Sequence, residues 1–251
     1  MNRRFVLAAT LAALVAVPIA SPLAAAAART PGPAAARPAS PPPAPAPLGD
    51  LVRITMVTEL GPIELELDHQ HAPVTTENFV RYVDARRFDG MTFYRAMHIA
   101  WGDQPNGLVQ TGLRGDPTKL FKPIAHEPTS QTHVLHKAGA LSMARWTPGT
   151  ATSDFSILLA DMPGLDADPS ATDPERQAGY AAFGHVVTGM DVVRRIWDAP
   201  RSPTEGQGVM KGQMLSPPIK VLTVRRSAVQ PAAAAPPPAT PASAMPAPAA
   251  P

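Results

Sequence analysis

The chain contains no cysteine among its 251 residues. This excludes disulfide bonds, so the folded part must be held together by its hydrophobic core. The formal net charge is only +2, which is too small to indicate a nucleic-acid-binding protein. No long apolar run follows the first 20 residues, so we expect no membrane span beyond them. The sequence also shows no internal repeat, which excludes a repeat architecture.

The first 28 residues have the features of a secretory signal peptide. Arg3 and Arg4 precede an apolar run over residues 5–20, and small residues at 24–28 offer an Ala-x-Ala-type cleavage site. The alternative is an uncleaved membrane anchor. However, the run is short for a span of about 20 residues, and Pro18 interrupts it. We therefore predict a periplasmic or secreted protein.

Proline and alanine dominate both ends of the chain. Of the 32 prolines, 10 lie before Asp50 and 8 lie after Gln230. Segments of this composition cannot bury a core and behave as extended spacers. We therefore predict a linker over residues 29–50 and a disordered tail over residues 228–251. The remaining residues, 51–227, are enough for one domain with a sizeable core.

Alternating polarity in this domain predicts many short strands. Ile63, Leu65 and Leu67 alternate with acidic residues, which is the pattern of a half-buried strand. Residues 52–68 thus predict two strands around a turn at Gly61 and Pro62. Further strand-like segments lie near residues 91–97, 107–112, 139–145, 153–160, 180–187 and 217–227.

Two segments instead show helical spacing. Residues 72–90 place Pro73 near a helix start, with Thr75 or Thr76 as the cap and an apolar stripe of Phe79, Val80 and Val83. Residues 189–199 predict a second helix, with Asp191 as its cap and Val192, Val193 and Ile196 facing inward. Many short strands with two helices favour an antiparallel β-barrel with helices packed over its openings.

The order of the motifs resembles that of a cyclophilin, a peptidyl-prolyl cis-trans isomerase. The matching stretches are "GPIELEL", "TTENFV", "FDGMTFYR", "VQTG", "GALSMAR", "ATSDFSI", "LD" and "YAAFGHVVTGMDVV". The loop "PRSPTEGQGVMKG" is similar to the exported bacterial branch. The resemblance implies a mostly β fold, an eight-stranded antiparallel barrel capped by two α-helices, with the substrate in a surface groove.

The resemblance also implies a set of site residues. The arginine of the F-x-R motif, which is Arg95 here, would be the catalytic residue. The implied substrate-binding residues are Phe93, Leu108, Gln110, Ala144, Asp154, Ser156, Leu165 and Tyr180. No metal or cofactor is implied. The expected partners are proline-containing peptides and unfolded exported proteins, and we expect a monomer.

The chemistry of proline isomerisation explains why an arginine is needed. Rotation about the bond before proline meets a barrier of about 18–20 kcal/mol because the nitrogen shares its lone pair with the carbonyl. In the twisted transition state this nitrogen becomes a hydrogen-bond acceptor, so a donor aimed at it stabilises that state and not the planar one. Arginine is always charged and holds its donors in a rigid plane. Strand alternation places Leu108 and Gln110 on one face, as a groove lining requires.

The sequence departs from the family at the proline slot. Ser156 stands where a phenylalanine lines the slot, and Asp154 replaces a glutamine. A second phenylalanine, before the glutamine, is missing near Gly107. Our hypothesis is that Trp101, or Met97 with Ile99, folds back to rebuild the slot. The alternative is that Trp101 packs on the barrel rim.

Other functional classes find less support. His126, Glu127, His133 and His136 fit no zinc signature, and Ser142 lacks the G-x-S-x-G turn of a hydrolase. The lost aromatics leave one alternative open, which is a cyclophilin-like binding module or scaffold with weakened turnover.

Overall fold

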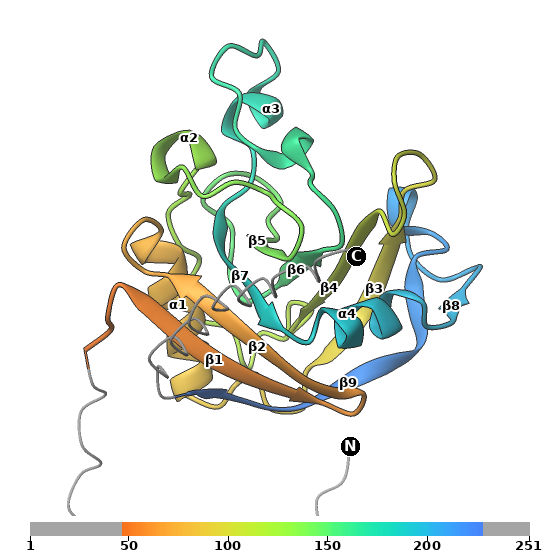
Figure 1. Ribbon diagram of the computed structural model, residues 1–251. Helices are drawn as coiled ribbons and strands as arrows, with labels where there is room; N and C mark the ends of the chain where they lie inside the picture. The colour runs from red at the N-terminus through yellow and green to blue at the C-terminus, as the bar shows by residue number, and fades with distance from the viewer. Residues whose placement is uncertain (1–46, 228–251) are drawn as a thin grey trace, which may run out of the picture. The chain divides into compact units, whose positions relative to one another are not determined.

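A computed structural model describes residues 47–227 (Figure 1). The predicted signal peptide, the tail and all but the end of the linker lie outside the described residues.

Eight strands close into an antiparallel barrel, because the eighth strand in the order below, β9, also pairs with the first, β1. The order is β1 (Leu51–Thr58), β2 (Gly61–Asp68), β7 (Ala182–Thr188), β5 (Ala140–Met143), β6 (Phe155–Leu158), β4 (Gly107–Gly112), β3 (Thr92–His98) and β9 (Met214–Arg226). The two-residue strand β8 (Arg201–Ser202) pairs only with β9. The predicted fold class is confirmed.

The helices are more numerous than expected. The two predicted ones are α1 (Pro73–Asp84) and α4 (Met190–Trp197). The described chain adds two short helices, α2 (Thr129–Thr132) and α3 (Pro174–Ala178), and two 3₁₀ turns, η1 (Pro163–Leu165) and η2 (Gly208–Met210). Their brevity hid them, because four or five residues carry no readable helical period. Within residues 47–227, no helix combines the length and apolarity needed to cross a membrane.

The barrel interior and two helices share one hydrophobic core. Ile63, Leu65 and Leu67 are fully buried, which confirms the alternating pattern of β2. The turn before this strand lies at residues 59–60, so Gly61 and Pro62 open β2 instead of forming the turn. Helix α1 contributes Phe79, Val80 and Val83 to the core, and α4 contributes Val192, Val193 and Ile196, as predicted. The ring of Phe79 lies 5.0–5.6 Å from those of Phe88, Phe155 and Phe183.

Both predicted helix caps are wrong. No side chain at the N-cap of α1 bonds its first amides, and Thr75 donates its own hydroxyl to Glu127. The Glu127 carboxylate also accepts from the amides of Val74 at 3.0 Å and Thr75 at 2.7 Å, so a residue from a distant loop caps this helix. Asp191 lies inside the first turn of α4 and pairs with Arg195 at 2.8 Å.

Candidate active site

One row of side chains crosses four strands on the outer face of the barrel. Arg95 on β3 pairs with Gln110 on β4, Gln110 pairs with Ser156 on β6, and Ser156 pairs with Ser142 on β5. Directly paired residues of antiparallel strands share a face. The intervening residues of β4 and β6 belong to the core, so the row faces outward. The fold thus brings Arg95, Gln110 and Ser156 together, as predicted.

The guanidinium of Arg95 is held from three sides. Its Nη1 donates to Oε1 of Gln110 at 2.9 Å, and its Nε donates to Oε1 of Gln213 at 2.8 Å. Its Nη2 lies 3.6 Å from the sulfur of Met97. These contacts use three of the five N–H donors. Among the described residues nothing bonds the other two, so the fork is fixed in place and still able to donate.

Partial burial affects Arg95 in two ways. Loss of hydration lowers the pKa of the guanidinium below its usual value. An arginine begins so far above neutrality that it stays charged at any physiological pH. A half-buried cation is also less screened by water, so its remaining donors would act more strongly on any hydrogen-bond acceptor that reaches them.

Gln213 is a site residue that the sequence reasoning missed. It lies directly before β9, at the end of the loop 203–213, and its amide nitrogen donates to the carbonyl of Val209 at 2.7 Å. The amide therefore connects the η2 turn to Arg95. The long loop before the last strand is visible in the sequence, but its residues do not show which of them contacts Arg95.

Met97 belongs to an apolar row beside Arg95. This residue pairs with Leu108, which pairs with Leu158, so an apolar row lies next to the row of Arg95. Leu108 is only 7% exposed. Gly107 cannot carry a side chain, because its φ is +140° and a Cβ would lie 1.9 Å from the carbonyl oxygen of Met97. Close contact between β3 and β4 thus excludes a phenylalanine at position 107.

The hypothesis that Trp101 folds back onto the slot is wrong. Its side chain is 75% exposed, which also excludes a packed position on the rim. The β3–β4 loop is closed by its own hydrogen bonds, in which Asn106 donates to the carbonyl of Trp101 at 2.7 Å and Gln104 donates to that of Ile99 at 3.0 Å. These bonds hold the loop in shape without the indole, which stays exposed.

The prediction that Phe93 binds substrate is also wrong, because this residue is fully buried in the core and cannot touch a ligand. A β-bulge between Phe93 and Arg95 shifts the register, so the two residues do not share a face.

Asp154 is half-buried and occupied by internal bonds. Its carboxylate accepts from the hydroxyl of Tyr94 at 2.7 Å and from that of Ser153 at 2.8 Å. Burial, together with Asp154, raises the pKa of Tyr94 far above its usual range. The carboxylate of Asp154 is therefore engaged in holding Tyr94, which is next to Arg95 in the sequence.

Ala144, Leu165 and Tyr180 come from three loops that are bonded to one another. The amide of Tyr180 donates to the carbonyl of Leu165 at 2.8 Å. Arg145, next to Ala144, lies over the Tyr180 ring at 4.7 Å. All three predicted residues are half-buried. The loops thus form one connected rim.

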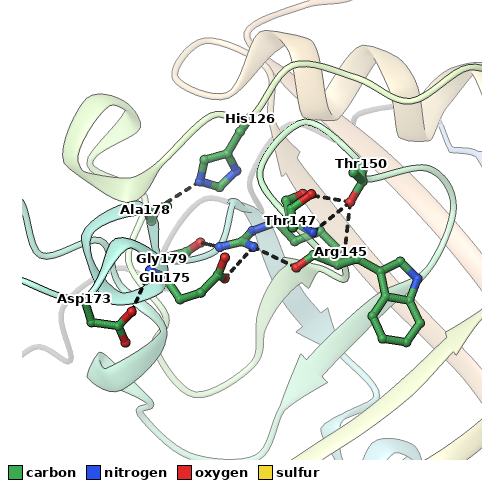
Figure 2. A network of polar contacts seen from close by, with 9 residues as sticks. His126, Arg145, Thr147, Thr150, Asp173, Glu175, Ala178 and Gly179 are labelled. Atoms are coloured by element: carbon green, nitrogen blue, oxygen red, sulfur yellow. Dashed lines mark hydrogen bonds and ion pairs between the residues drawn. The ribbon is translucent and has the colours of Figure 1, made fainter.

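Figure 2 shows how Arg145 holds this rim. The side chain is 1% exposed; it pairs with Glu175 at 2.8 Å and donates to the carbonyl of Gly179 at 2.6 Å. His126 lies 2.9 Å from the carbonyl of Ala178. Together they satisfy the carbonyl groups at the end of α3, which a helix cannot bond itself.

The residues weighed as metal ligands have separate contacts. Glu127 caps α1, His126 lies at the end of α3, and His136 bonds Asp166. His133 follows α2 in a left-handed conformation. No group of three or more possible ligands occurs within residues 47–227.

Comparisons with known proteins agree on one family. Residues 53–224 match the family described as "Cyclophilin type peptidyl-prolyl cis-trans isomerase/CLD". A peptidyl-prolyl cis-trans isomerase of Acinetobacter baylyi is 36% identical over 185 residues, covering 71% of this chain and 87% of the relative. Peptidyl-prolyl cis-trans isomerase A of Dickeya dadantii is 36% identical over 147 residues, covering 57% and 70%.

Solved structures show the same fold. The crystal structure of a Cryptosporidium parvum cyclophilin-type isomerase superposes with a TM-score of 0.55 at 17% identity, covering 71% of this chain and 98% of that one. A second crystal structure of that protein, obtained in the presence of the dipeptide Ala-Pro, gives 0.54 at 18% identity and covers 70% and 99%.

Proposed function

Because the chain belongs to the cyclophilin-type peptidyl-prolyl cis-trans isomerase family, we propose that it speeds X-Pro isomerisation in exported proteins, with Arg95 as the catalytic residue. One observation supports this best. The guanidinium is fixed by Gln110 and Gln213, yet keeps two N–H donors for a ligand on the outer face of the barrel.

The mechanism requires no covalent step. A peptide lies along the row of Arg95, Gln110 and Ser156 with its proline ring on the apolar row of Met97 and Leu108. As the imide bond twists, the proline nitrogen no longer shares its lone pair with the carbonyl, and a free N–H of Arg95 can bond that lone pair. The donor stabilises the twisted state more than either planar isomer, which lowers the barrier in both directions.

The proposal that the clients are exported proteins rests on the first 28 residues. Their basic beginning, apolar run and small-residue end are those of a signal peptide. The binding of proline peptides is supported by the relative studied with Ala-Pro.

An isomerisation assay tests the proposal directly. Micromolar protein should speed the cis–trans exchange of an Ala-Pro peptide. Without protein this exchange takes on the order of tens to hundreds of seconds. Exchange measured by NMR needs no coupling protease. Relaxation at the uncatalysed rate would contradict the enzymatic reading.

A second function is favoured by one observation. Ser156 is 7% exposed and supplies no aromatic wall, so the slot holds proline with less apolar area than in the family. The alternative is a proline-peptide binding module. Peptide binding by the wild-type protein without faster exchange would support the module.

Gln213→Ala should lower kcat/KM roughly tenfold, because a guanidinium freed on one side is misplaced relative to the imide nitrogen. The matched control is Gln207→Ala, which removes an exposed glutamine side chain from the same loop. NMR exchange rates for both variants check this. Equal loss in the two variants would show that the loop, and not the bond to Arg95, is responsible.

A further inference from the structure

A buried hydrogen-bond chain lies beside the row of site residues. Ser142, the last member of the row, has its hydroxyl 2.8 Å from Nε2 of His136, and Nδ1 of His136 lies 2.7 Å from Oδ1 of Asp166. A carboxylate accepts hydrogen bonds, so Nδ1 carries the proton and Nε2 accepts from the serine. Burial lowers the pKa of His136, which agrees with a neutral ring.

The order Ser–His–Asp suggests a nucleophile, but the surroundings do not support one. Ser142 is 4% exposed, so a substrate carbonyl cannot reach its oxygen. The next backbone amide, that of Met143, already donates to the carbonyl of Ala181 at 2.9 Å and cannot serve an oxyanion. We therefore assign these hydrogen bonds a structural role, which is to hold the segment that carries Asp166.

His136 brackets the η1 turn at both ends. Its carbonyl accepts from the amide of Met162, directly before the turn, at 2.8 Å. Its own amide donates to Oδ1 of Asp166, directly after the turn, at 3.0 Å. A single oxygen of Asp166 thus receives both the amide and the ring of His136, while the ring also bonds the barrel through Ser142.

Leu165, the last residue of η1, is one of the predicted substrate-binding residues. Three residues of 3₁₀ turn have little stability of their own, so their position depends on the bonds at their ends. We propose that His136 and Asp166 are positioning residues, which hold Leu165 against the bound peptide. This inference rests on the proposed isomerase function.

The test compares three substitutions at Asp166. Asparagine keeps an acceptor oxygen in the same place without charge; glutamate keeps the charge but moves the oxygen by one methylene; alanine removes the acceptor. In this proposal Leu165 stabilises the planar and the twisted peptide equally. Loss of its contact with the peptide therefore raises KM and leaves kcat nearly unchanged. We expect KM to rise about tenfold in Asp166→Ala and Asp166→Glu, and to change less than twofold in Asp166→Asn.

Asp161→Ala is the matched control, because Asp161 accepts from the amide of Ala138 at 2.8 Å and from Lys137 at 3.0 Å, on the same segment but outside the turn. Its KM should stay within twofold of wild type. Thermal melting identifies any variant that is unfolded at the assay temperature, and Asp166→Glu then replaces Asp166→Ala.

The outcomes separate this inference from the proposed function. An unchanged KM in folded Asp166→Ala and Asp166→Glu, with normal wild-type turnover, would overturn the positioning role alone. A fall in kcat with constant KM would also overturn it. Absence of turnover in the wild-type protein would refute the isomerase function, and peptide affinity measured by titration would then replace KM for the same three variants.

Discussion

Replacing Arg95 by alanine is expected to lower kcat/KM by about 10²- to 10³-fold, which is the loss seen when one donor to a developing charge is removed. The reason is geometric. Gln110 and Gln213 hold the guanidinium from two sides at 2.9 and 2.8 Å, so in the proposed mechanism the free donors would meet the imide nitrogen without prior reorganisation. Because this bond forms only in the twisted state, the loss should appear mainly in kcat.

The control for Arg95→Ala is Arg95→Lys, which keeps the charge but loses the planar fork. A lysine cannot bond both glutamines and the substrate in one plane, so we expect it to recover little activity. Circular dichroism and peptide affinity should be close to wild type in both variants. If Arg95→Ala turned over peptide at the wild-type rate, the donor mechanism would be wrong.

Replacing Glu127 by alanine is expected to reduce the free energy of unfolding by about 2–4 kcal/mol, since a lost cap and unpaired buried donors each cost on the order of 1–2 kcal/mol. The carboxylate is buried and accepts from the amides of Val74 and Thr75 and from the Thr75 hydroxyl. Helix α1 supplies core residues such as Phe79, so a frayed helix start also loosens the packing beneath it.

Urea denaturation followed by circular dichroism measures this effect. Glu127→Gln is the matched control, because it preserves shape and one acceptor while removing the charge that strengthens these bonds. It should lose roughly half as much stability as the alanine variant. A change below 0.5 kcal/mol in Glu127→Ala, taken here as roughly the size of an ordinary surface substitution, would show that the cap contributes little.

Local patterns were sufficient for much of the fold. The alternation of Ile63, Leu65 and Leu67 predicted a strand with one buried face, and the spacing of Phe79, Val80 and Val83 predicted the buried face of α1. These patterns are readable because burial follows the period of the backbone. The motifs around Arg95 and Gln110 identified two residues that the barrel pairs directly.

The same rules failed where the backbone broke its period. Strand alternation would place Phe93 and Arg95 on one face, but the bulge between them turns Phe93 into the core and Arg95 outward. A bulge depends on pairing with both neighbouring strands, and one strand alone carries no sign of it.

Short-range patterns by themselves favoured a barrel of short strands with two main helices, and the resemblance to cyclophilins implied the arginine at the centre of the proposed site. Only the folded chain decided what holds that site together. Gln213 reaches Arg95 from 118 residues away, Glu127 caps a helix 52 residues before it, and Asp166 bonds His136 across 30 residues. Such contacts depend on how the strands and loops come together in space, and local sequence patterns do not predict contacts between residues so far apart in the chain.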